Sequence, residues 1–136
     1  MGVPRRSALG RLQRAVVGRL LRWPTARLLP RSLLLLEYRG RRTGQAHALP
    51  AQWAPDGDLL VVAVGHWRRK RWWRNLAPGP LPVRVHVAGR ADPAVARLLL
   101  PDDPGYDGAV RAYRARFARA PLEPGVPLVV LRRGGP

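Results

Sequence analysis

The chain has 136 residues, 46% of them hydrophobic, so it can bury one core and is not compositionally disordered. Its 25 Lys and Arg residues against 8 Asp and Glu give a formal net charge of +17, which indicates an anionic partner: nucleic acid, an anionic membrane surface or an acidic ligand. The absence of cysteine excludes disulfides, thiolate metal sites and a cysteine nucleophile. No apolar run approaches the roughly 18–20 residues of a spanning helix, and arginines interrupt any signal-peptide core. We therefore expect a cytoplasmic protein.

Residues 8–22 are predicted to form an amphipathic helix. Leucines and valines fall on one half of its helical wheel, and arginines fall on the other half. Such a helix can lie on anionic lipid at the inner face of the membrane, or it can pack its apolar half on the domain. A linker containing Pro30 follows. We therefore divide the chain into residues 1–29, a basic helix and linker, and residues 30–136, one cofactor-binding domain.

Apolar runs predict six strands in this domain. The runs at 33–38 and 59–64 are continuously apolar, which is typical of strands covered on both faces. Pro50 marks an edge, a bulge or a ligand-facing position in the second strand, and Pro93 places the fifth strand at an edge. Residues 55–58 have the composition of a hairpin turn. The strands are expected at residues 33–38, 47–53, 59–64, 83–87, 91–99 and 126–131.

Two further helices are expected. A basic loop from His66 leads into a short helix that stops near Pro78, and a longer helix covers residues 105–119 with Asp103 as its N-cap. The longer helix would bury Val110, Tyr113 and Phe117. Strands in this order with few helices predict an α+β fold, a small antiparallel barrel with helical decorations.

The turn Gly40-Arg41-Arg42-Thr43-Gly44 is the first candidate site. Glycines let the backbone approach a ligand, consecutive N–H groups can form an anion-binding concavity, and arginines bind phosphate or carboxylate bidentately. The spacing fits neither a P-loop nor a GxGxxG motif. A solvated basic hairpin turn is the alternative interpretation.

The sequence offers few residues suited to catalysis or to metal binding. His47, His66 and His86 lack metal-ligand spacing, so we expect no metal. Both serines lie in the N-terminal region, which argues against a Ser/His/Asp set. If the protein is an enzyme, we expect a cofactor to carry the chemistry.

Two motifs in their order and spacing resemble the deazaflavin-dependent nitroreductase family of small split β-barrel flavin and deazaflavin oxidoreductases, many of them actinobacterial. They are the turn at residues 40–44, after an apolar strand, and Trp72-Trp73-Arg74-Asn75-Leu76. Pro50, the hairpin at 55–58 and the C-terminal run 126–131 fit the same pattern. The use of arginine in place of lysine, with Lys70 the single exception, is typical of a GC-rich genome.

The resemblance implies a split β-barrel (FMN-binding-like) that binds coenzyme F-420 and passes a hydride to a quinone, nitroaromatic or other conjugated acceptor. The cofactor tail carries a phosphodiester and several glutamates, and flavin mononucleotide (FMN) is the alternative ligand. By position, the phosphate and tail would be held by Arg41, Arg42, Thr43 and Gly44. The deazaflavin ring would lie against Pro50, Ala51, Gln52, Ala63, Val64, Gly65 and His66, with Trp73 and Asn75 closing the site. Tyr106 or Tyr113 would face the substrate.

A binding module is the alternative function. Arginines interleaved with tryptophans could track single-stranded nucleic acid by charge and stacking, although tryptophans in a helical run are more typical of a core. A cofactor-carrying relative without catalysis is the third interpretation. The resemblance allows either a monomer or a homodimer, and it associates some members with membrane-borne quinones, as the helix at 8–22 would permit.

Overall fold

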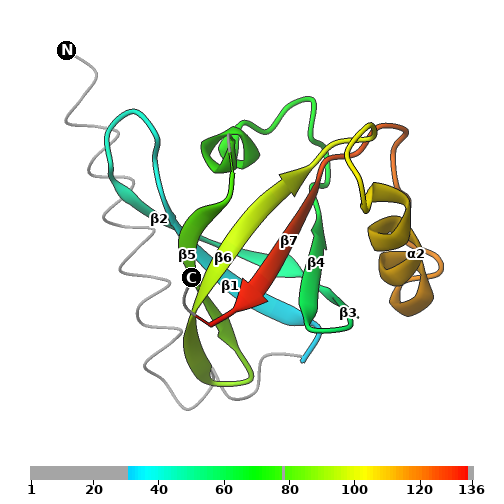
Figure 1. Cartoon of the computed structure of the whole chain (residues 1–136), viewed down its shortest axis with the longest axis horizontal. Helices are drawn as coiled ribbons and strands as arrows, with labels where there is room; N and C mark the ends of the chain where they lie inside the picture. The colour runs from blue at the N-terminus through cyan, green and yellow to red at the C-terminus, as the bar shows by residue number, and fades with distance from the viewer. Residues whose placement is uncertain (1–30, 78, 135–136) are drawn as a thin grey trace.

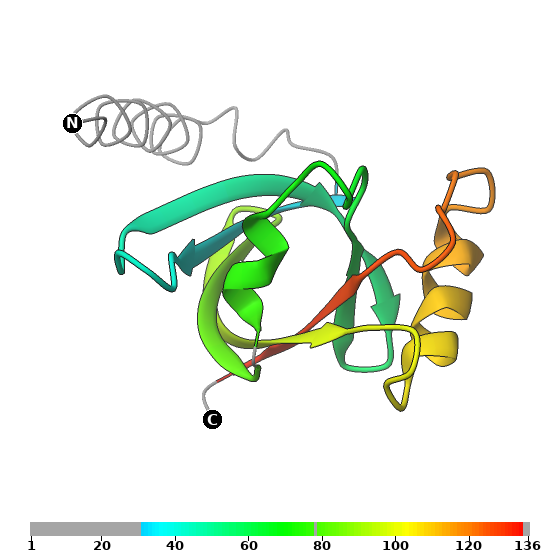
Figure 2. The same ribbon diagram turned by 90° about the horizontal axis from the view of Figure 1, so that it is seen from above.

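The computed structural model describes residues 31–77 and 79–134, and the helix expected over 8–22 lies outside them. Seven strands form one antiparallel sheet that curls into a half-barrel, and an α-helix packs beside it (Figures 1 and 2). This architecture agrees with the predicted small antiparallel barrel. The elements are β1 (Leu33–Arg39), β2 (Ala46–Gln52), β3 (Ala54–Asp56), β4 (Leu59–Ala63), the 3₁₀ helix η2 (Trp72–Leu76), β5 (Leu81–Val87), β6 (Arg90–Leu99), α2 (Tyr106–Arg116) and β7 (Leu128–Arg133).

The strand order β2-β1-β5-β6-β7-β4-β3 explains the curl of the sheet. β2 and β3 are separated by one residue, Trp53, yet they form opposite edges. Trp53 is fixed at this corner because its backbone N–H donates to the Ser32 carbonyl at 2.9 Å and its indole N–H donates to the Arg31 carbonyl at 2.8 Å. The chain therefore leaves one edge of the sheet and joins the other, which draws the two edges towards each other.

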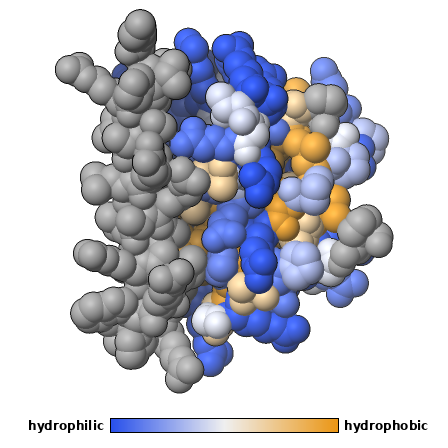
Figure 3. Space-filling model, turned by 90° about the vertical axis from the view of Figure 1, so that its left-hand side faces the viewer, coloured by the Kyte–Doolittle hydropathy of each residue, from blue (hydrophilic) through white to orange (hydrophobic). Residues whose placement is uncertain are grey.

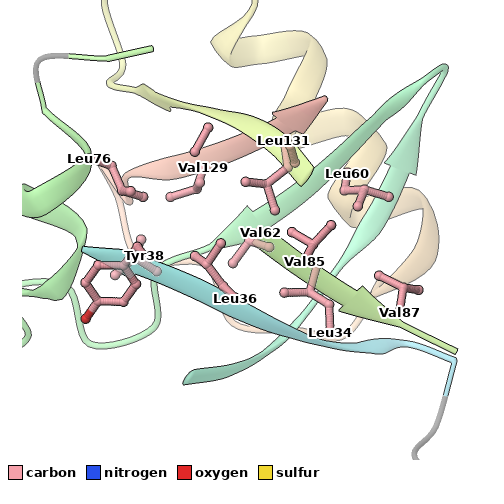
Figure 4. Close-up of a cluster of buried hydrophobic side chains, with 13 residues drawn as sticks. Leu34, Leu36, Tyr38, Leu60, Val62, Leu76, Val85, Val87, Val129 and Leu131 are labelled. Atoms are coloured by element: carbon pink, nitrogen blue, oxygen red, sulfur yellow. The ribbon is translucent and has the colours of Figure 1, made fainter. Parts of the chain in front are cut away.

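Two buried clusters cover the two faces of the central strands. Leu60 and Val62 of β4 point into the half-barrel, whereas Val61 between them points towards α2. The inner cluster also takes side chains from β1, β5, β6 and β7, as Figure 4 shows for most of them. Leu36 and Val85 in this cluster have no exposed surface. The continuously apolar run at 59–64 was correctly interpreted as a strand buried on both faces.

The proline predictions had different outcomes. Pro50 lies in β2, an edge strand, as predicted. The edge position predicted from Pro93 is wrong for its strand, because β6 pairs with both β5 and β7. Pro93 is tolerated because the β6–β7 register begins only at Ala94, opposite Arg133. The missing N–H of Pro93 therefore interrupts no ladder bond to β7.

The helices also differ from the prediction. The short helix expected after the basic loop is the five-residue 3₁₀ helix η2. Helix α2 buries Tyr113 and half-buries Val110 and Phe117 as predicted. The predicted N-cap is wrong: Gly105, at φ 89°, caps α2, while the Asp103 carboxylate accepts from the backbone N–H of Leu100 at 2.7 Å. Neither η2 nor α2, the helices of the described ranges, has the length and hydropathy to cross a bilayer.

Candidate functional site

The turn between β1 and β2 is held by its own backbone. The N–H of Gly40 donates to the Gln45 carbonyl, and the N–H of Gly44 donates to the Gly40 carbonyl, both at 2.8 Å. The Arg39 guanidinium donates to the Gly44 carbonyl at 3.0 Å. Gly44 has φ 67°, a left-handed conformation that strains other residues. The turn is therefore a fixed platform for Arg41 and Arg42.

Asn75 joins this turn to η2. Its Oδ1 accepts from the backbone N–H of Arg41 at 3.0 Å, and its Nδ2 donates to the Trp72 carbonyl at 2.9 Å. The two motifs lie 34 residues apart in the chain and meet through this single side chain. An asparagine is suited to the position because its side chain both donates and accepts.

A cavity of about 320 Å³ lies between the turn and η2, and we call it the arginine cavity. Gly40 allows its wall to pack closely, since a Cβ there would lie 3.3 Å from both His47 Nε2 and Thr43 Oγ1. The cavity contains no carboxylate and four guanidinium groups. Its lining residues are Gly40, Arg41, Arg42, Thr43, His47, Arg71, Arg74 and Asn75.

The charge of the cavity is not neutralised by the protein. All eight acidic residues lie within the described ranges, and none of them lines the arginine cavity. Among the described residues, one arginine forms an ion pair with a carboxylate. It is Arg90, whose Nε lies 3.1 Å from Oδ1 of Asp92, away from this cavity. The described part of the face in Figure 3 is mainly hydrophilic, with smaller apolar areas. Arginines gathered without counter-charge provide the donors and the charge that phosphate or carboxylate needs.

The tryptophans of η2 stabilise the loop before it. The Trp73 indole N–H donates to the Trp67 carbonyl at 3.1 Å and to the Lys70 carbonyl at 2.8 Å. The Trp73 ring packs edge-on against Trp67, with centroids 6.3 Å apart, and the Arg74 guanidinium lies 5.4 Å from its centroid. Trp67, Trp72 and Trp73 are half-buried against the inner cluster. These contacts leave little free ring surface for stacking bases.

The residues expected around the deazaflavin ring form a separate group. Pro50, Ala51 and Gln52 end β2, and six residues at about 3.3 Å each place that end about 20 Å from the turn. The segment 63–66 begins at the last residue of β4, a strand that contacts β2 across the curl. Val64 is buried, whereas Gly65 and His66 are exposed. An elongated ligand could reach both groups, and the ring-binding role of these residues stays a prediction.

The two tyrosines expected to face the substrate are buried, and their substrate-facing role stays a prediction. Tyr106 and Tyr113 are buried beneath α2, where the Tyr106 hydroxyl donates to the Val126 carbonyl at 2.7 Å. Burial raises the pKa of both phenols, and the charge of Asp107 adds to the effect at Tyr106. Neither tyrosine lines the arginine cavity.

Three cavity residues had no assigned role from the sequence: His47, Arg71 and Arg74. In a 3₁₀ helix residues three apart lie on the same side, so Arg74 follows Arg71, the N-cap of η2, towards the cavity. His47 stacks on Tyr38, with ring centroids 5.4 Å apart. The i, i+3 spacing of Arg71 and Arg74 could have indicated that both face the cavity, but only if the helix were known to be 3₁₀. No group of three His, Cys, Asp or Glu side chains suited to a metal ion occurs within residues 31–77 and 79–134.

Known proteins share both the sequence pattern and the fold. A Mycobacterium tuberculosis protein, named as a candidate F420H(2)-dependent quinone reductase, is 29% identical over 110 residues, which cover 76% of this chain and 91% of that protein. Two solved structures share the fold. An F420-H2 dependent reductase has a TM-score of 0.57 at 14% identity and covers 75% of this chain and 95% of its own. HutZ, the heme storage protein from Vibrio cholerae, has a TM-score of 0.58 at 18% identity and covers 81% and 86%.

The model of one protein family matches nearly the whole chain, from residue 2 to residue 131. The match spans β1, the arginine-rich turn, η2 and the following strands through most of β7. The chain belongs to the F420H(2)-dependent quinone reductase family.

Proposed function

We propose that the arginine cavity holds the phosphate of F420H(2) and that the acceptor of the hydride is a quinone. The cofactor itself follows from the family, whose members are F420H(2)-dependent oxidoreductases. The observation that carries the proposal is the meeting of Arg41, Arg42, Arg71 and Arg74 around one cavity without a carboxylate.

The donor set fits this cofactor. A phosphodiester and carboxylates need several charged donors, and planar guanidinium groups bind both bidentately. Thr43 adds a hydroxyl, although its Oγ1 already accepts from the backbone N–H of Gln45 at 3.2 Å. The absence of a side chain at Gly44, where a Cβ would have no heavy atom within 4 Å, leaves room for close approach by the ligand.

The protein residues would bind and orient, since no nucleophile is needed. When bound, the reduced deazaflavin supplies a hydride, which with one proton converts a quinone to a hydroquinone. The buried phenols of Tyr106 and Tyr113 are poorly placed to give that proton, because their hydroxyls lie in the cluster under α2. We propose that solvent supplies the proton and that Pro50 to Gln52 and Ala63 to His66 form the walls at the ring.

A turnover assay tests this proposal. Purified protein with F420H(2) and a water-soluble naphthoquinone should regenerate the fluorescence of the oxidised cofactor much faster than the protein-free control. A nitroaromatic compound offered at the same concentration should react more slowly. Cofactor binding without turnover of any acceptor would contradict the reductase role and favour a cofactor carrier.

Association with an anionic membrane is a further part of the proposal. The first 30 residues contain no acidic residue, and a helix over residues 8–22 would place arginines opposite leucines and valines. Each arginine near an anionic surface contributes about 1 kcal/mol. Co-sedimentation with vesicles containing phosphatidylglycerol should therefore weaken when Arg11 and Arg14 are replaced by glutamine, and neutral vesicles should not bind the protein. Equal sedimentation with neutral vesicles would contradict this part of the proposal.

The chain is either a monomer or a homodimer, and size-exclusion chromatography would decide between the two.

A further inference from the structure

A second cavity, of about 480 Å³, opens where β1 and β5 separate. These strands pair only from Leu34 opposite Val87 to Glu37 opposite Arg84. β1 nevertheless continues to Arg39, and β5 already begins at Leu81. Beyond this paired stretch, the end of β1 and the start of β5 are not paired with each other. Their backbone N–H and C=O groups on the facing edges therefore border the cavity.

The side chains of this cavity are both apolar and charged. Tyr38, Leu76 and Leu81 give it an apolar wall, while Arg39 and Arg84 are exposed at its border. Glu37 is its single carboxylate, and its Oε1 lies 3.0 Å from Nε2 of His86. The arginines therefore outnumber the carboxylate.

Asn75 lines both this cavity and the arginine cavity, so the two are neighbours. The β1–β5 cavity borders β2 at Ala46, at the end of that strand next to the turn, whereas the residues proposed for the deazaflavin ring lie towards its other end. A ligand whose phosphate occupies the arginine cavity and whose ring extends along β2 would direct its other end past Asn75 into the β1–β5 cavity.

We infer that the cavity between β1 and β5 binds the oligoglutamate tail of the cofactor, an inference that rests on the proposed function. The tail is peptide-like, so its amides suit unpaired strand edges, and its carboxylates suit Arg39 and Arg84. A small planar acceptor is a poorer occupant, because this cavity borders β2 at Ala46, at the opposite end of the strand from the residues proposed for the ring.

The test compares two forms of the cofactor, one without glutamates and one with several. Titration followed by cofactor fluorescence should show that the wild-type protein binds the glutamylated form at least about fivefold more tightly, the upper range for an exposed ion pair. Arg84→Gln should remove most of that gain and leave the affinity for the glutamate-free form unchanged. Glu37→Gln should strengthen binding of the glutamylated form only.

Arg97→Gln is the matched control, because Arg97 is exposed on β6, lines neither cavity and gives the same change in net charge. It should behave as wild type with both forms. Equal wild-type affinity for the two forms, or a full tail-dependent gain in Arg84→Gln, would overturn the inference while leaving the proposed function intact. If neither form binds, the proposed function fails, and the inference fails with it.

Discussion

Asn75 offers the sharpest single-residue test of the site, because it connects two segments that bind the cofactor in our account. Asn75→Ala removes the hydrogen bond from the Arg41 N–H at 3.0 Å and the hydrogen bond to the Trp72 carbonyl at 2.9 Å. At about 0.5–1.5 kcal/mol each, the two contribute about 1–3 kcal/mol. The first bond is exposed and the second is part-buried, so we take the middle of this range, about 2 kcal/mol, and assign about 1.4 kcal/mol of it to binding and the rest to folding stability.

The expected result for Asn75→Ala is a loss of about tenfold in F420 affinity, the equivalent of about 1.4 kcal/mol. Titration of the protein with oxidised F420, followed by fluorescence, measures it. Asn75→Asp separates geometry from charge. The aspartate keeps an acceptor for Arg41 but places a carboxylate among four arginines, so it should bind the anionic cofactor more weakly than the alanine variant. Wild-type affinity in Asn75→Ala, or tighter binding by the aspartate than by the alanine variant, would refute the reasoning.

Three other predictions follow from contacts elsewhere in the structure. Gly44→Ala and Gly57→Ala each force an alanine into a left-handed turn, where its Cβ would have no heavy atom within 4 Å. Each variant should lower the free energy of unfolding by about 1–2 kcal/mol in denaturant titrations. Only Gly44→Ala should also weaken F420 binding. Tyr106→Phe leaves the Val126 carbonyl without its partner and should cost about 1–3 kcal/mol of stability with unchanged turnover, whereas a drop in turnover at equal cofactor saturation would restore a substrate-facing role. Burial raises the pKa of all three tyrosines of the chain, Tyr38, Tyr106 and Tyr113, above the ordinary 10.0. As the pH rises, the unfolded chain therefore loses these protons before the folded protein does. The free energy of unfolding should fall as the pH rises above 10. An ultraviolet titration with any phenolate forming below pH 10 in the folded protein would contradict that pattern.

The strands were predictable because their signal is local. The runs at 33–38 and 59–64 are apolar at every or nearly every position, and the structure buries side chains on both faces of β4. The short strand β3 was missed because Pro55 and Asp56 have turn composition. It forms because Trp53 directs the chain to the other edge of the sheet, where Ala54 to Asp56 pair with β4.

The helical segments show where local patterns stop being sufficient. The basic loop and the tryptophans predicted a helix after Gly65 but not its 3₁₀ form, which is accompanied by the Trp73 indole bonds to the Trp67 and Lys70 carbonyls. Asp103 and Pro104 have the composition of a helix start. Gly105 replaces Asp103 as the cap because the Asp103 carboxylate is already bonded to the Leu100 N–H.

The candidate site was predictable only in part. The turn at residues 40–44 has an anion-binding composition that the sequence displays directly. Its junction with Asn75, and the contribution of Arg71 and Arg74, depend on a contact between residues 34 positions apart. The sequence alone could not assign roles to Tyr106 and Tyr113, because a tyrosine on a buried helix face has the same sequence signature whether its hydroxyl meets a ligand or a backbone carbonyl.

The most direct test of the central claim is the affinity of the purified protein for oxidised F420 with and without the charges of the turn. Arg41→Gln with Arg42→Gln removes two of the four guanidinium groups of the arginine cavity. Our account predicts micromolar or tighter binding by the wild-type protein, weakened at least tenfold in the double variant, with the Arg97→Gln control unchanged. Equal affinity of the double variant and the wild type would show that the cofactor phosphate binds elsewhere.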